Sequence, residues 1–194
     1  SNIDMFHQTA TLLSAFHGFG EEPDKKIAQL AYKEREPIRK ADLVLLLRVM
    51  NRDEDESFFQ ELFDSTTSPL VKLCAAVNLC HCHQSPPAAV AAHVAATVGK
   101  NNRKLINDYQ SLGAVNDYWY DMAQILALSS PEIADQCAPV FIREMEKTAF
   151  ANEEEMMAVL IIAFLRDKKM RINDPTPLQK RAARAVVDKA FPTP

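Results

Sequence analysis

The sequence predicts an all-α protein in which antiparallel helix pairs pack into a stack. Three observations lead to this prediction. Only four glycines occur in 194 residues, and glycine costs about 1 kcal/mol relative to alanine inside a helix. Apolar residues recur at steps of three and four along most of the chain, as on one face of a helix. Several stretches also open with a capping side chain followed by proline, which is typical of a helix start.

These helix starts are the clearest local signals. Ser68-Pro69, Ser85-Pro86, Ser130-Pro131 and Thr176-Pro177 place a hydroxyl before a proline, and Glu22-Pro23 and Glu36-Pro37 are weaker versions. Together with the apolar periodicity they predict helices over residues 3–17, 23–34, 37–51, 55–64, 69–83, 86–98, 102–112, 115–128, 131–148, 152–167 and 176–190. The connections are short, so we expect neighbouring helices to be antiparallel.

Two apolar stretches could be either strands or helices, and one predicted helix contains an internal proline. Leu43–Val49 and Val159–Phe164 are apolar enough for buried strands, but their composition and helical flanks favour buried helices. Pro139 lies inside the helix predicted over 131–148, and we expect that helix to be kinked or broken there.

Charge is distributed unevenly. The formal net charge is −4, which argues against a surface built mainly for nucleic acid. From Arg166 to Lys189 there are eight Lys and Arg against three Asp and Glu, which leaves −9 on the rest of the chain. The residues we single out as a candidate basic patch are Lys168, Lys169, Lys180, Arg181 and Arg184. A solvated helix face is the simpler interpretation of this cluster.

One segment carries a recognisable repeat pattern. From Ser68 to Leu79 a helix-starting proline leads to Val71-Lys72, then to a small pair, then to leucine, and this order resembles the HEAT repeat. A second copy runs from Asp174 to Val186, and a weaker one starts at Pro37. The spacing is irregular, residues 99–113 look like an insertion, and most of the Asp and Arg positions expected between repeats are absent.

The resemblance implies a right-handed stack of antiparallel helix pairs, a HEAT-like superhelix. An irregular helical bundle is the alternative. We assign residues 1–191 to a single helical-repeat domain and 192–194 to a disordered tail. Because the sequence opens without an initiator Met, we expect segments of the natural chain to lie outside it.

The cysteines and histidines raise the question of a metal site. Cys80-His81-Cys82-His83 contains zinc-ligand types, but adjacent helical residues point about 100° apart, so the four cannot converge on one ion. We predict no metal and no cofactor, and we interpret the cysteines as reduced thiols. No Gly-rich phosphate loop, nucleophile elbow or His-Glu-x-x-His motif occurs, so an enzyme is the less favoured interpretation.

The three consecutive aromatic residues Tyr118, Trp119 and Tyr120 are candidate partner-binding residues. They sweep about 200° around a helix, so one apolar stripe cannot bury all three. Trp and Tyr are frequent interface anchors. The competing interpretation places Trp119 in the core with the tyrosine hydroxyls directed outward.

The function we predict is therefore a non-catalytic protein-binding or scaffold module, since helical stacks expose long surfaces suited to extended partners. The partner is another protein or a peptide. The alternative is a nucleic-acid-binding HEAT-like protein that uses the basic C-terminal region. A link to the lyase-type HEAT proteins that handle bilins would rest on fold analogy alone. The longest apolar run has ten residues, too short for a membrane span, and no secretory signal opens the chain, so we expect a cytoplasmic protein.

Overall fold

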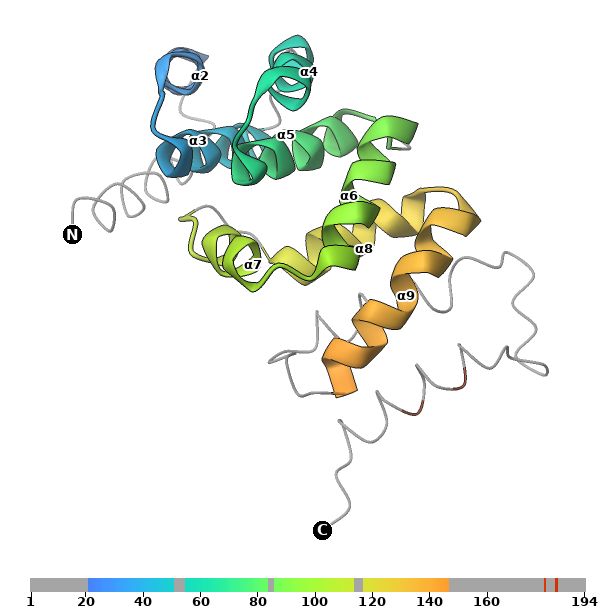
Figure 1. The fold of residues 1–194 in the computed structure, drawn as a ribbon. Coiled ribbons are helices and arrows are strands. Elements are labelled where there is room, and N and C mark those ends of the chain that lie inside the picture. Colours follow the sequence, from blue (N-terminus) through green and yellow to red (C-terminus); the bar gives the residue numbers. More distant parts are fainter. Residues whose placement is uncertain are drawn as a thin grey trace. The chain divides into compact units, whose positions relative to one another are not determined.

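A computed structural model of the chain describes residues 21–50, 55–83, 86–113 and 117–146, together with Lys180 and Arg184. These residues form helices and contain no strand, so the predicted all-α class is confirmed for them. The helices, labelled as in Figure 1, are α2 (Glu21–Lys33), α3 (Pro37–Val49), α4 (Glu56–Ser65), α5 (Pro69–Cys82), α6 (Ala88–Lys100), α7 (Arg103–Gln110), α8 (Tyr118–Leu128) and α9 (Pro131–Glu146). The helices predicted over 3–17 and 152–167 lie outside the described residues.

The proline signals locate helix starts well. Helices α3, α5 and α9 begin at the predicted prolines, and Leu43–Val49 is helical, as predicted. Helix α6 begins two residues later than predicted, at Ala88, because a residue that precedes proline disfavours the helical conformation, and Pro86 precedes Pro87. We expected the helix to be kinked or broken at Pro139, and it is not broken there, while the kink stays a prediction. Helix α9 continues through this proline, which lies on the exposed side, where water can satisfy the carbonyl that it leaves free.

The chain divides into two compact units. One contains Ser1–Val90 and Asn102–Tyr118, and the other contains Ala91–Asn101 and Trp119–Pro194. Each is described by itself below. The assignment of residues 1–191 to a single domain stays a prediction.

In the first unit, α2 packs on α3 and α4 packs on α5, and the two pairs meet through α3 and α5. Figure 1 shows α2 and α4 on one side of α3 and α5, and α7 on the other. Ala41 in α3 and Ala75 in α5 are fully buried. Small buried residues such as these leave room for neighbouring helices to pack closely.

Helix α5 is the centre of this unit. Ten of its fourteen residues are buried, so it is covered on nearly all sides by α3, α4 and α7. Asn78 is the one polar residue among the ten buried residues of α5. Its Nδ2 donates to the carbonyl oxygens of Val44 in α3, at 3.0 Å, and of Cys74 in α5, at 2.9 Å. The bond to Val44 ties α5 to α3, and the bond to Cys74 within α5 satisfies the second N–H of the amide.

Two further polar contacts tie this unit together. Asp42 of α3 is fully buried, and its Oδ1 accepts a hydrogen bond of 2.7 Å from the backbone N–H of Gly113, which follows α7. The hydroxyl of Tyr32 in α2 donates to the carboxylate of Asp55, just before α4. The Tyr32 ring also packs edge-on against Phe58, at 4.2 Å between centroids.

In the second unit, the core includes an edge-to-face pair of Trp119 in α8 and Phe141 in α9, with 5.3 Å between ring centroids. The thiol of Cys137 in α9 donates to the carbonyl of Ala95 in α6. Asn101 follows α6 with φ 47°, a left-handed conformation that asparagine adopts more readily than most residues. Among the described residues, no helix combines the length and apolar character that a bilayer crossing requires.

Candidate functional site

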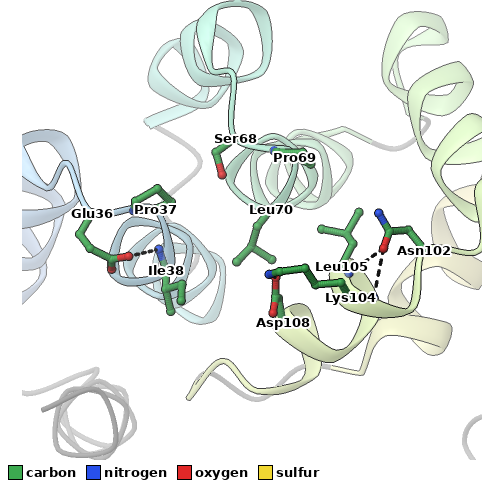
Figure 2. A pocket seen from close by; sticks show the side chains of 10 residues that line it. All are labelled: Glu36, Pro37, Ile38, Ser68, Pro69, Leu70, Asn102, Lys104, Leu105 and Asp108. Atoms are coloured by element: carbon green, nitrogen blue, oxygen red, sulfur yellow. Dashed lines mark hydrogen bonds and ion pairs between the residues drawn. The ribbon is translucent and has the colours of Figure 1, made fainter. Parts of the chain in front are cut away.

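The candidate site is a pocket where three helices of the first unit begin. Its volume is about 420 Å³, within the range of ligand-binding pockets. The residues that line it come from the starts of α3, α5 and α7, except for Asp108 in the last turn of α7 (Figure 2): Glu36, Pro37, Ile38, Ser68, Pro69, Leu70, Asn102, Lys104, Leu105 and Asp108. Because all three helices contribute their first residues, their N-termini lie on the same side of the unit.

Each helix start is capped by its own side chain. Glu36 accepts hydrogen bonds from the backbone N–H groups of Ile38, at 3.1 Å, and Arg39, at 2.7 Å. Asn102 Oδ1 accepts from Lys104, at 3.1 Å, and Leu105, at 3.3 Å.

The start of α5 is capped more weakly, because Ser68 Oγ accepts from Val71 at 3.4 Å. Pro37 and Pro69 occupy the first turns of α3 and α5, where a missing N–H costs nothing. Their role in capping thus explains why these polar residues and prolines occur at the three helix starts that border the pocket.

The pocket has an apolar centre and a polar rim. Leu70 is buried, while Ile38 and Leu105 are partly exposed, and Figure 2 shows Leu70 between the α3 and α7 sides. At the rim, Lys104 Nζ lies 2.5 Å from Asp108 Oδ2, one turn further along α7. The pocket therefore offers an aliphatic surface bordered by two carboxylates and one ammonium group.

An additional carboxylate precedes α3. Glu34 has its pKa lowered from its ordinary value, chiefly by the hydrogen bond from the Glu36 backbone N–H, against some desolvation, and also by the Arg35 N–H and the charges of Arg39 and Lys40. Glu34 is therefore ionised at neutral pH.

The structure places the cysteine–histidine segment at the end of α5. Cys80 is buried, and burial together with the neighbouring Cys82 raises the pKa of its thiol to about 12. Cys82 is half-buried, His81 is exposed, and His83 Nε2 lies 3.1 Å from Glu56 Oε1. Across the described part of the chain, no three His, Cys, Asp or Glu side chains gather as a metal site would require.

The three candidate aromatic residues are distributed differently. Tyr118 and Trp119 are buried, with 1% and 2% of their surfaces exposed, and Tyr120 is half-buried. Tyr118 packs edge-on against Tyr109 at 5.8 Å between centroids. Two of the three aromatics thus belong to the core of their respective units.

Of the candidate basic patch, Lys180 and Arg184 are described, and both are helical and exposed. Lys168, Lys169 and Arg181 lie outside the described residues.

No local sequence signal identifies the pocket as a site. Glu36 and Ser68 were recognised as helix starts but not as neighbours, and Asn102 was not recognised as a cap. The signal that relates them is their spacing, since the three caps follow one another at 32 and 34 residues, close to the length of a helical repeat. No protein-family model, curated protein or solved structure matches this chain.

Proposed function

We propose that this protein is a non-catalytic protein-binding module of the helical-repeat type, and that the pocket at the starts of α3, α5 and α7 receives a partner side chain. The observation that carries the proposal is the meeting of these three helix starts. Helices that begin side by side at repeat-like intervals suit a stack of helix pairs of the HEAT-like kind. Such a stack presents equivalent helix ends as one continuous binding surface.

The chemistry of the pocket favours binding over catalysis. Its two carboxylates already have partners, since Glu36 caps α3 through two backbone N–H groups and Asp108 pairs with Lys104. The Ser68 hydroxyl caps α5. These groups hold the pocket in shape, and the apolar centre is what remains for a guest.

The apolar centre gives a usable contribution to affinity. Full burial of one aliphatic side chain contributes about 1.5–3 kcal/mol, which corresponds to roughly 10- to 150-fold in Kd. One anchor of this kind gives weak binding, and contacts along the neighbouring helix ends add to it.

A peptide-display selection tests the proposal with two matched variants. Leu105→Gln makes the pocket polar at a partly exposed position, and Leu30→Gln makes the same change at an exposed leucine of α2 outside the pocket. We expect peptides selected on the natural chain to bind Leu105→Gln roughly tenfold more weakly and to bind Leu30→Gln unchanged. If no peptide is enriched, or if enriched peptides do not distinguish the variants, the pocket is not a protein-binding site.

The second candidate function is nucleic-acid binding through the basic C-terminal region. It is supported by Lys180 and Arg184, which are exposed and lie one helical turn apart. Binding of DNA and RNA at low and high salt tests it, because phosphate contacts weaken steeply as salt rises. Absence of binding at low salt would remove this candidate.

We also propose a reducing compartment such as the cytoplasm. All four cysteines fall within the described residues and all are thiols rather than disulfides.

A further inference from the structure

The electrostatics of the pocket narrow the kind of partner that it accepts. Helix N-termini ordinarily attract anions, because their first N–H groups lack partners and the helix dipole is positive there. At the starts of α3 and α7 these donors are occupied, whereas the start of α5 has only the weak cap from Ser68. The Glu36 carboxylate takes the N–H groups of Ile38 and Arg39, and Asn102 Oδ1 takes those of Lys104 and Leu105. An anionic guest would meet a carboxylate at α3 where it needs donors.

The carboxylates border the apolar centre on two sides. Figure 2 shows Glu36 on the α3 side and Asp108 on the α7 side, with Leu70 between them. Each carboxylate oxygen has a second lone pair, so the oxygens of Glu36 can accept from a guest while they cap α3. A guest that places an aliphatic group over Leu70 thus brings its neighbouring group within reach of a negative charge.

Among the described residues that line the pocket, Lys104 is the one cation, and its side chain is easily displaced. It is 83% exposed, whereas Asp108 is 32% exposed. Exposed ion pairs between neighbouring turns contribute little to stability. A cation carried by a guest can therefore replace Lys104 at Asp108 while the lysine moves into solvent.

We propose that the pocket recognises an extended segment of a partner protein in which an aliphatic residue is followed directly by lysine or arginine. The aliphatic side chain covers Leu70, and the cationic group pairs with Asp108 or Glu36. This inference rests on the proposed function and specifies its partner. Charge complementarity between a guest cation and the two carboxylates distinguishes this segment from a neutral or acidic one.

Three short end-capped peptides of glycine and serine serve as probes. The central two residues are leucine–lysine in the first peptide, leucine–glutamate in the second and serine–lysine in the third. Binding is followed through the NMR shifts of the protein's backbone amides. We expect the leucine–lysine peptide to shift the amides of Ile38, Leu70 and Leu105 and to bind most tightly. The double variant Glu36→Gln with Asp108→Asn neutralises both carboxylates, and we expect it to lower the affinity for the leucine–lysine peptide about two- to fivefold per charge.

Two controls keep the test specific. Glu61→Gln with Asp64→Asn changes the net charge equally on exposed positions of α4 and leaves the preference for lysine intact. Lys104→Gln should increase the affinity for the leucine–lysine peptide, because the competing cation is gone. In a pocket that binds anions, the same change would lower the affinity for the ligand.

The outcomes separate this inference from the proposed function. If the leucine–glutamate peptide binds equally or more tightly in the pocket, the cationic preference is wrong while the protein-binding function stands. If display yields pocket-dependent peptides that lack lysine and arginine, the same conclusion follows. If neither leucine peptide binds and display yields nothing, both proposals fail.

Discussion

Asn78 gives the sharpest test of the packing between α3 and α5. Its side chain is 1% exposed and donates to two backbone carbonyls, one on each helix. Asn78→Leu removes both hydrogen bonds and keeps the branched shape of the side chain, although leucine is the larger residue. Since both carbonyls also accept within their own helices, no acceptor is left without a partner. We expect a loss of about 1–2 kcal/mol in the free energy of unfolding.

Asn78→Asp keeps the size and replaces the donor with a carboxylate oxygen that faces the two carbonyls. Because this buried charge has no donor among these partners, the expected loss at neutral pH is about 3–5 kcal/mol. Burial raises the pKa of the new carboxyl in the folded state above its unfolded value of about 3.9. The penalty is therefore absent below the unfolded pKa, where both states are protonated, and grows as pH rises toward the folded pKa.

Urea unfolding followed by far-ultraviolet circular dichroism measures these differences for both variants and the natural chain. At neutral pH Asn78→Asp should be clearly less stable than Asn78→Leu, and acidification to about pH 5 should narrow the gap. Equal stabilities at neutral pH, or a gap that widens on acidification, would refute the assigned hydrogen bonds.

Three other predictions concern the cores, a helix end and the thiols. Trp119→Ala, which leaves a cavity beside Phe141, should lower the free energy of unfolding by about 3–5 kcal/mol, whereas Leu128→Ala, at a position that is 54% exposed, should change it by no more than about 0.5 kcal/mol. Thermal melts compare the two variants, and equal effects would contradict the burial of Trp119. Asn101→Val should lower the melting temperature more than Asn101→Gly, because a β-branched residue held at positive φ destabilises the fold by about 1–2 kcal/mol. The reverse order would exclude a left-handed backbone at residue 101. In the folded chain iodoacetamide should alkylate the half-buried Cys82 before Cys80, whose thiol has a pKa of about 12 and should react only after unfolding. Peptide mass mapping identifies the labelled cysteine, and early labelling of Cys80 would contradict its burial.

The helices were predictable where local chemistry decides them. A capping side chain followed by one proline determines a first turn regardless of the rest of the fold, so the starts of α3, α5 and α9 were predicted to the residue. The errors arose where a second influence competes. At α6 the doubled proline delays the helix, and at the exposed Pro139 water can satisfy the carbonyl that loses its partner, so the helix is not interrupted.

The pocket was beyond sequence reasoning because it depends on tertiary packing. Glu36, Ser68 and Asn102 are each readable as polar residues before a helix, but their proximity follows from α3, α5 and α7 packing with their starts on one side. Three consecutive aromatic residues cannot all lie on one buried stripe of a helix, and this much follows from helix geometry. Which of Tyr118, Trp119 and Tyr120 remains partly exposed depends on the neighbouring helices, whose positions are set by tertiary packing.

The central position of α5 has a consequence for synthesis on the ribosome. Helices α3 and α4 precede α5 in the chain, but α7, which covers another side of it, is made later. From the end of α5 to the end of α7 the ribosome adds 28 residues, which takes roughly 1–6 s. During that interval the nascent chain exposes the side of α5 that includes Leu70. Slow codons between residues 83 and 110 would prolong this exposure and increase aggregation of the nascent chain, even though the finished protein would be unchanged.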